Sequence, residues 1–157
     1  MAANFDHYLG VKAENIENAK ALPLGHYHAD ITGWKTKETD FKQGRGPQPM
    51  LELQMRTTAP SDDVEESDLP ANGGVGVVIS KDYEFNPVDN NGKVEGGAAA
   101  AIRRLADQLD LDVKGLELRD ILDALKGQSV LAYNEPRADK NDPEVTYTSI
   151  KKVLAPK

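Results

Sequence analysis

The chain has 157 residues, of which 29% are charged and 39% hydrophobic, and its formal net charge is -7. This composition is typical of one globular domain with a real core, and it argues against intrinsic disorder and membrane insertion. The acidic balance also argues against a protein that coats duplex DNA, although a small groove on an acidic body can still be locally positive. Cysteine is absent, which excludes disulfides, thiol catalysis and thiolate metal sites.

The first residues and the hydropathy of the chain indicate where in the cell the protein is expected. The first six residues lack the basic and apolar regions of a signal peptide, and no apolar run approaches the roughly 20 residues that span a bilayer. We therefore expect a cytoplasmic protein (in the host cytoplasm if a phage encodes it) without membrane contact. Residues 1–21 are predicted to form an irregular N-terminal arm that packs onto the body through apolar side chains such as Leu9.

A first strand is predicted for residues 26–34, where apolar and polar side chains alternate. The alternation puts Trp34, the only tryptophan, on the polar face next to Lys35 and Lys37. Two interpretations of Trp34 stay open. Its ring either stacks on a base or another ligand, or packs under a loop at the end of the strand.

A basic loop and a second strand follow. Residues 36–49 combine glycines and prolines with Lys42 and Arg45, which is typical of a loop that either covers a groove or is simply solvated. Residues 50–58 alternate again, and this pattern predicts a strand with Arg56 on its outward face.

A long acidic loop at 59–74 separates the second strand from the third. Five acidic residues fall between positions 62 and 68, but their spacing does not match a calcium-binding loop. A solvated excursion is therefore favoured over a metal or partner site. Residues 75–85 are rich in valine and isoleucine and predict the third strand.

Two amphipathic helices are predicted next. Apolar residues recur at helical spacing in 98–111 and again in 118–126, where Gly127 ends the second helix. The glycine- and alanine-rich start of the first helix, 96–101, lacks the lysine and hydroxyl residue of a Walker motif and the spacing of a dinucleotide fingerprint. It therefore does not predict a nucleotide site.

The last third of the chain supplies two more strands, at 129–133 and 145–154, joined by a polar turn at 134–144. Three strands, a helical crossover at about 98–126 and two closing strands are the element order of an OB-fold, a five-stranded, partly open barrel. We therefore expect a mainly β protein with helices (α+β). Residues 22–157 would form a single OB-fold domain with a helical insertion between strands 3 and 4.

The sequence shows no recognisable catalytic motif. The chain shows no nucleophile elbow, no assignable Ser-His-Asp arrangement and no recognisable pair of carboxylates. His26 and His28 share a predicted strand face with Asp30, which permits a metal, but no further ligand is identifiable, so a structural role is favoured. We expect a protein that is not an enzyme and has no cofactor or metal.

Binding of single-stranded nucleic acid has more support. Proteins of this kind stack bases on aromatic faces and meet the phosphates with lysine and arginine. In the predicted barrel, such side chains gather on adjoining strands and loops, including the closing hairpin. The candidate nucleic-acid-binding residues are Trp34, Lys35, Lys37, Lys42, Arg45, Arg56, Tyr133, Arg137, Lys140, Tyr147 and Lys151.

Both ends of the domain resemble a known family. Residues 22–31 (Leu-Pro-Leu-Gly-His-Tyr-His-Ala-Asp-Ile) are similar to the leucine-proline-x-glycine-x-tyrosine opening strand of small phage single-stranded DNA-binding proteins with an OB-fold. The helix and glycine of 118–127, followed by 144–153 (Glu-Val-Thr-Tyr-Thr-Ser-Ile-Lys-Lys-Val), resemble the ending of the same proteins. There a tyrosine-x-x-isoleucine-x-x-valine pattern recurs. The resemblance spans about residues 22–154.

The resemblance implies sequence-tolerant binding of single-stranded DNA in phage replication or recombination, partners among replication or recombination proteins, and frequent self-association into homo-oligomers. By position, it implies that Tyr147 and Lys151 lie near the binding surface. This sequence departs from the pattern in two ways. It ends without the acidic tail by which many such proteins recruit partners, and its acidic loop at 62–68 would repel DNA near a groove. The alternative function is a protein-interaction or virion-associated module that binds a basic protein.

Overall fold

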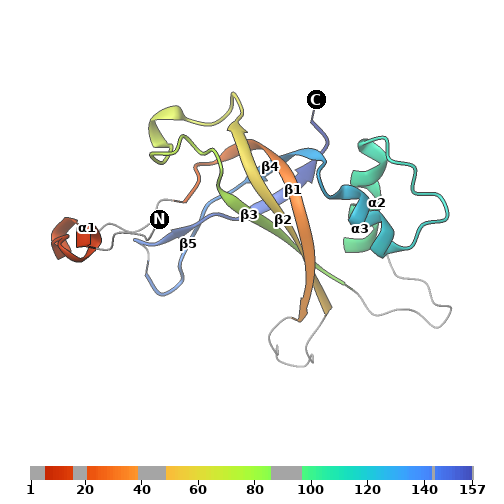
Figure 1. Cartoon of the computed structure of the whole chain (residues 1–157), viewed down its shortest axis with the longest axis horizontal. Coiled ribbons are helices and arrows are strands. Elements are labelled where there is room, and N and C mark those ends of the chain that lie inside the picture. Colours follow the sequence, from red (N-terminus) through yellow and green to blue (C-terminus); the bar gives the residue numbers. More distant parts are fainter. Residues whose placement is uncertain (1–5, 16–20, 39–48, 86–96, 143, 157) are drawn as a thin grey trace.

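The structure, a computed structural model, describes residues 6–15, 21–38, 49–85, 97–142 and 144–156. Lys42 and Arg45, two of the predicted site residues, lie outside these ranges. The described chain is mainly β with two longer helices, and its strands form a five-stranded antiparallel sheet and a small two-stranded ribbon (Figure 1). None of the helices within these ranges has the length and hydrophobicity to cross a membrane.

The main sheet has the strand order β3-β2-β1-β4-β7. Its members are β1 (Gly25–Glu38), β2 (Pro49–Pro60), β3 (Val78–Glu84), β4 (Ser129–Asn134) and β7 (Ile150–Leu154). The two edge strands, β3 and β7, approach one another. No ladder of hydrogen bonds joins them in the described ranges, so the sheet curls toward closure but is not closed.

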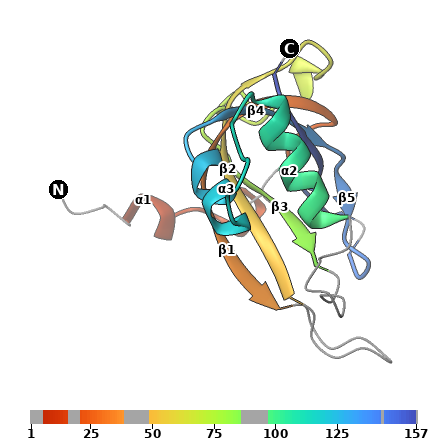
Figure 2. The same ribbon diagram turned by 90° about the vertical axis from the view of Figure 1, so that its right-hand side faces the viewer.

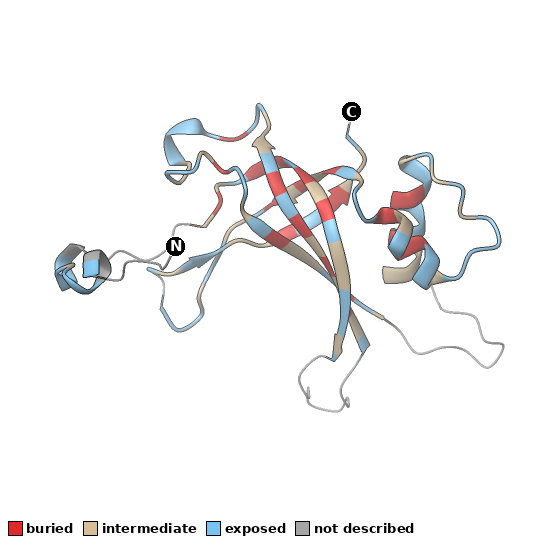
Figure 3. Cartoon of the chain, viewed as in Figure 1, coloured by how far each residue is buried: buried red, intermediate tan, exposed pale blue. Residues whose placement is uncertain are grey.

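The inner face of the sheet follows the alternation expected from the sequence. Side chains on a strand point to opposite faces in turn, so a period of two buries every second residue. Tyr27, Ala29 and Ile31 of β1 are at most 2% exposed, as are Leu53 and Met55 of β2. Figure 3 shows this buried stripe running along both strands. Removal of these apolar side chains from water is the main force that holds the sheet together.

Two helices complete the core. α2 (Ala98–Gln108) and α3 (Leu118–Leu125) bury the residues that the helical spacing predicts, with Ile102 in α2 and Leu125 in α3 fully enclosed. α3 begins with a capping box made by Glu117 and Asp120, which satisfies two backbone N–H groups. α3 lies against β1 and α2 lies against β7, and Figure 2 shows α2 crossing in front of the sheet.

Two segments differ from expectation. The final predicted strand is divided, because β5 (Arg137–Ala138) and β6 (Thr146–Tyr147) form a separate two-stranded ribbon before β7 begins. At the N-terminus, α1 (Asp6–Leu9) and the short 3-10 helix η1 (Ala13–Asn15) stand apart from the sheet in Figure 1. Leu9 is 80% exposed, so the expectation that it packs onto the body was wrong.

Candidate nucleic-acid interface

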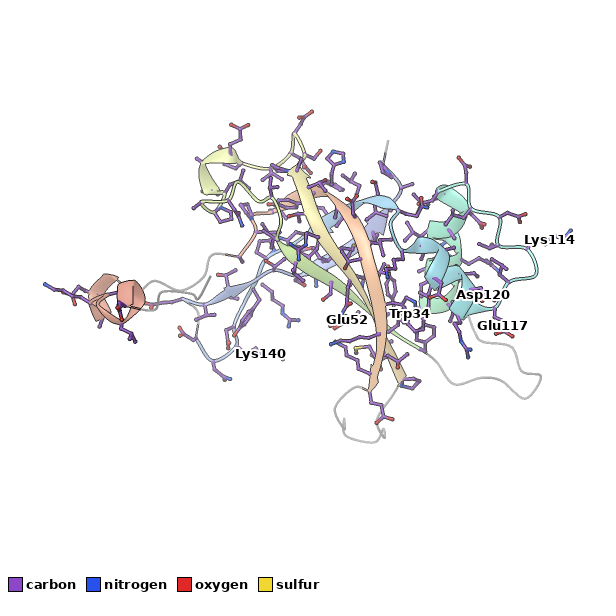
Figure 4. All side chains as sticks on the ribbon, in the orientation of Figure 1. Trp34, Glu52, Lys114, Glu117, Asp120 and Lys140 are labelled. Carbon is purple, nitrogen blue, oxygen red and sulfur yellow. The ribbon has the colours of Figure 1, made fainter. Side chains whose placement is uncertain are left out.

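The connection between β4 and β7, described for residues 135–142 and 144–149, is a hairpin that projects from the sheet (Figure 1); we call it the β5–β6 hairpin. Arg137 pairs with Tyr147 across the ribbon, and Lys140 lies near its tip (Figure 4). Tyr147 is 50% exposed, and its hydroxyl donates a 2.6 Å hydrogen bond to Asp139, which raises the pKa of the phenol. Arg137 and Lys140 are exposed and have no ion-pair partner in the described ranges.

A buried asparagine fixes the base of this hairpin. Asn134 is 0% exposed, and its side-chain amide donates to the carbonyl oxygens of Leu22, at 2.6 Å, and Pro23, at 3.0 Å. Its carbonyl oxygen accepts a 2.8 Å bond from the backbone N–H of Ser149. A buried amide stays in place only when its donors and acceptors are satisfied. Asn134 therefore ties the start of β1 to both ends of the hairpin.

Lys35 and Lys37 lie on the outer face of the sheet, where two carboxylates meet them. Lys35 contacts Glu52 at 3.4 Å, and Lys37 contacts Glu52 at 3.3 Å and Asp82 at 3.0 Å. The hydrogen bond to Asp82 is the largest cause of the raised Lys37 pKa. The Glu52 pKa is lowered, first by the hydrogen bond from Gln54 and then by the two lysines. The positive charge of this pair is therefore largely matched by acidic neighbours.

The expectation that Trp34 lies on the polar face beside these lysines was wrong. The register between β1 and β2 shifts between Ile31 and Gly33, so Thr32 is an extra residue and the alternation changes phase. Trp34 lies opposite the buried Leu53, packs against the core and donates a 3.0 Å hydrogen bond from Nε1 to Asp123 of α3. Figure 4 shows Trp34 and Glu52 on opposite sides of the sheet. Trp34 is therefore packed, but against the core and α3 and not under a loop as the second interpretation had it.

Tyr133 lies on the outer face of β4 beside a histidine–carboxylate pair. Its ring is 4.8 Å from the ring of His26, whose Nδ1 lies 2.6 Å from Asp63. Asp63 also accepts the backbone N–H of His26. Burial opposes ionisation of Asp63, but the two hydrogen bonds from His26 outweigh it and keep the Asp63 pKa below its usual value. One carboxylate of the acidic loop therefore stands close to Tyr133.

Arg56 and the possible metal site on β1 remain to be placed. Arg56 is exposed on β2 and has no described ion-pair partner. Asp30 accepts a 2.8 Å hydrogen bond from Ser129, and His26 is occupied by Asp63. Within the described ranges no group of three histidine or carboxylate side chains is placed to hold a metal.

A cleft of about 410 Å³ opens where the sheet is not closed, between β3, β7 and α2. We call it the β3–β7 cleft. Four basic residues line it: Lys81 from β3, Arg104 from α2, and Lys151 and Lys152 from β7. Lys151 has no partner in the β4–β7 ladder, because Tyr133 pairs with Lys152 and Asn134 with Ile150. Such a bulge redirects a side chain relative to a regular strand.

Sequence reasoning proposed Lys151 but missed Lys81 and Arg104. Lys81 is one lysine in a strand, with no motif around it. Arg104 had a weak signal, because Ala98, Ala101 and Arg104 recur every three residues and so fall along one stripe of the helix. That stripe faces the cleft. Only the approach of β3 to β7 brings the cations together.

The structure thus separates the predicted residues into an exposed hairpin, a lysine pair matched by acids and a basic cleft. Comparison with known protein families finds no family that matches the chain, and comparison with curated proteins finds no significantly similar sequence. Function has to be argued from these surfaces.

Proposed function

We propose that the chain is an OB-fold protein that binds single-stranded DNA without sequence preference, as the phage proteins that its two ends resemble are expected to do. The strand order supports the fold assignment. Counting β7 as the fifth strand, β1 is flanked by the second and fourth strands, β3 approaches the fifth, and both helices fall between the third and fourth. A five-stranded, partly open Greek-key barrel has this arrangement.

The observation that carries the functional proposal is the position and exposure of the β5–β6 hairpin. In OB-folds, oligonucleotides bind on strands 2 and 3 and on the loops that join strands 1 to 2 and 4 to 5. The hairpin is the second of these loops, and it presents Arg137, Lys140 and Tyr147 to solvent. Lys42 and Arg45 belong to the first loop in sequence, outside the described ranges.

The chemistry of the hairpin suits a strand of any sequence. An exposed tyrosine ring offers a face on which every base can stack, worth roughly 1–3 kcal/mol per base. Arginine and lysine meet phosphates, which every nucleotide carries. The residues proposed to contact DNA thus read the backbone and the base faces. We expect binding that tolerates sequence and weakens steeply with salt.

The test is fluorescence anisotropy of labelled oligo-dT and of a matched duplex across a salt series. We expect the protein to prefer the single strand. Lys140→Ala should weaken binding and lower the slope of log K against log salt by about 0.7, the value for one lost phosphate contact on single strands. Lys114→Ala is the matched control, since Lys114 is an exposed loop lysine at the helical end of the molecule (Figure 4) and should bind as wild type.

Tyr147 separates stacking from hydrogen bonding. Tyr147→Ala should lower affinity about tenfold or more, whereas Tyr147→Phe, which keeps the ring and loses only the bond to Asp139, should stay close to wild type. Absence of any oligo-dT binding at low salt would sink the proposal. Indifference to oligonucleotides together with co-purification of a basic protein would favour the alternative, in which the exposed Glu65 and Glu66 of the acidic loop serve as the interface.

A further inference from the structure

We infer that the β3–β7 cleft is a phosphate-binding site, separate from the β5–β6 hairpin. If the proposed function holds, it takes phosphodiester groups further along the same DNA strand. The assignment of DNA phosphates to the cleft rests on the proposed function, whereas the assignment of a phosphate-binding site does not. The inference assigns direct roles to Lys81 and Arg104, which no sequence pattern singled out, alongside Lys151.

Basic side chains in the cleft carry charge that no ion pair within the described ranges matches. Lys81, Arg104 and Lys151 come from three different elements and line one cleft, and none has a carboxylate within ion-pair distance in the described ranges. Two acidic residues also line the cleft, Asp82 and Glu84. The carboxylate of Asp82 is already engaged by Lys37 at 3.0 Å. Within the described ranges, the lining therefore holds more basic than acidic side chains, and one of its two carboxylates is already paired outside the cleft.

Lys81 is held in the cleft at a cost in free energy, because it is partly desolvated and lies near another lysine. Burial is the largest cause of the lowered Lys81 pKa; Asp82 partly opposes it, and the nearby charge of Lys151 lowers it further. Lys81 also lies over the ring of Tyr83, 5.1 Å from its centroid, which holds the ammonium inside the cleft. A bound anion would relieve both the desolvation and the repulsion between the two lysines. An anion in the cleft would thus favour the charged form of Lys81.

Helix α2 forms one wall of the cleft. α2 starts at the cleft, where Gly97 and Ala98 line it, and no side chain in the described ranges caps its first turn. The unpaired N–H groups of that turn carry a partial positive charge, which favours a nearby anion. Ala98 and Ala101 are small, so the wall next to Arg104 leaves room for a ligand. This adds to the field of the three side chains.

The lining fits a nucleic-acid backbone better than a free nucleotide. Its aromatic residue, Tyr83, is 8% exposed and covered by Lys81, so the described lining offers no open ring face for a base. Tyr147 and Lys151 are four residues apart, which places their Cα atoms no more than about 14 Å from each other. Phosphates close to a base stacked on Tyr147 would therefore lie within a few nucleotides of Lys151.

The test compares two double variants of the full chain. Arg104→Ala with Lys151→Ala removes two cleft cations, and Arg103→Ala with Lys114→Ala removes an exposed arginine next to Arg104 and an exposed lysine, neither of which lines the cleft. We expect the cleft variant to bind oligo-dT more weakly, with a salt slope lower by about 1.4, which corresponds to two phosphate contacts. The control variant should match wild type. Arg104→Lys with Lys151→Arg, which keeps both charges, should retain most of the slope.

Pyrophosphate is the second probe, read as the shift it causes in the thermal unfolding midpoint. We expect it to stabilise wild type and the control variant but not the cleft variant. If wild type binds oligo-dT and the cleft and control variants show the same slope, the assignment of DNA phosphates to the cleft is overturned and the proposed function stands. The phosphate site itself is then overturned if pyrophosphate stabilises the cleft variant as much as wild type. If wild type binds no DNA, the proposed function fails. Selective stabilisation by pyrophosphate would then support a site for a small phosphate compound, and its absence would overturn the site as well.

Discussion

Two groups of basic residues lie close together around β3, and they differ in what their charges face. On the outer face, Lys35 and Lys37 meet Glu52 and Asp82 at 3.0 to 3.4 Å. In the β3–β7 cleft, four basic side chains line one cavity, and none has a carboxylate within ion-pair distance in the described ranges. Asp82 stands between the groups, because it lines the cleft and pairs with Lys37.

Charge alone does not make a basic residue a phosphate ligand. A lysine already held by a carboxylate has to leave it, or share it, before it can bind an anion, and the carboxylate then repels that anion. A cation that no carboxylate holds meets neither cost. The outer-face pair, which belongs to the set predicted from the sequence, is therefore the weaker candidate, and the cleft is the stronger one.

The largest effect should come from loosening the helix that forms the cleft. Ile102 is 0% exposed in α2, and Ile102→Ala leaves a cavity under the helix. We expect a loss of about 2–5 kcal/mol in the free energy of unfolding, measured by urea denaturation. Oligo-dT binding should fall in the folded variant, because Arg104 moves with α2. The outer-face ion pairs lie on strands and should persist.

Arg103→Ala serves as the control for that experiment, since Arg103 lies on the exposed side of the same helix. Its effect on stability should stay within about 0.5 kcal/mol. Equal stability of the two variants would show that α2 is not seated on the core as described, and the cleft would lose its wall.

The next effect comes from making the outer face resemble the cleft. Glu52→Gln removes the carboxylate that holds Lys35, so we expect tighter oligo-dT binding at low salt and a slope steeper by about 0.7. Adding Asp82→Asn also frees Lys37 and should steepen the slope by about 0.7 more. The measurement is the same anisotropy series.

The control is Glu66→Gln, which makes the same change in net charge on the exposed acidic loop. It should leave the slope unchanged. If Glu66→Gln tightens binding as much as Glu52→Gln, the gain reflects overall charge, and the contrast between the two groups has no functional meaning.

Much of the fold follows from periodicity in the sequence. Tyr27, Ala29 and Ile31 are spaced as a strand and buried as one, and Ile102 lies on the predicted stripe of its helix. The bulge at Thr32 was not predictable, because it depends on the pairing of β1 with β2 and has no local pattern. For the same reason, Trp34 was predicted on the wrong face of the strand.

The candidate site was less accessible to sequence reasoning. Arg137, Lys140 and Tyr147 were expected on a closing hairpin and do lie there, since a polar turn between strands is a local feature. The partners of Lys35 and Lys37 were missed, because Glu52 and Asp82 are distant in sequence and meet them only across the sheet. Lys81 and Arg104 were missed for the same physical reason.

The smallest effect concerns pH and again separates the two groups. The Glu52 pKa is held below its usual value of about 4.5 by Gln54 and the two lysines. A folded-state pKa below the unfolded value means that the stabilisation is present above the usual pKa and is lost as pH falls through the folded-state pKa.

We expect wild type to exceed Glu52→Gln by about 0.2–1 kcal/mol in unfolding free energy at pH 7. The difference should shrink to nothing in acid. Urea titrations from pH 7 to pH 2.5 measure it, and the low pKa of Asp63 cancels because both proteins keep that residue. A difference that stayed constant with pH would mean that the charge of Glu52 does not stabilise the fold, and that Lys35 is as free as the cleft cations.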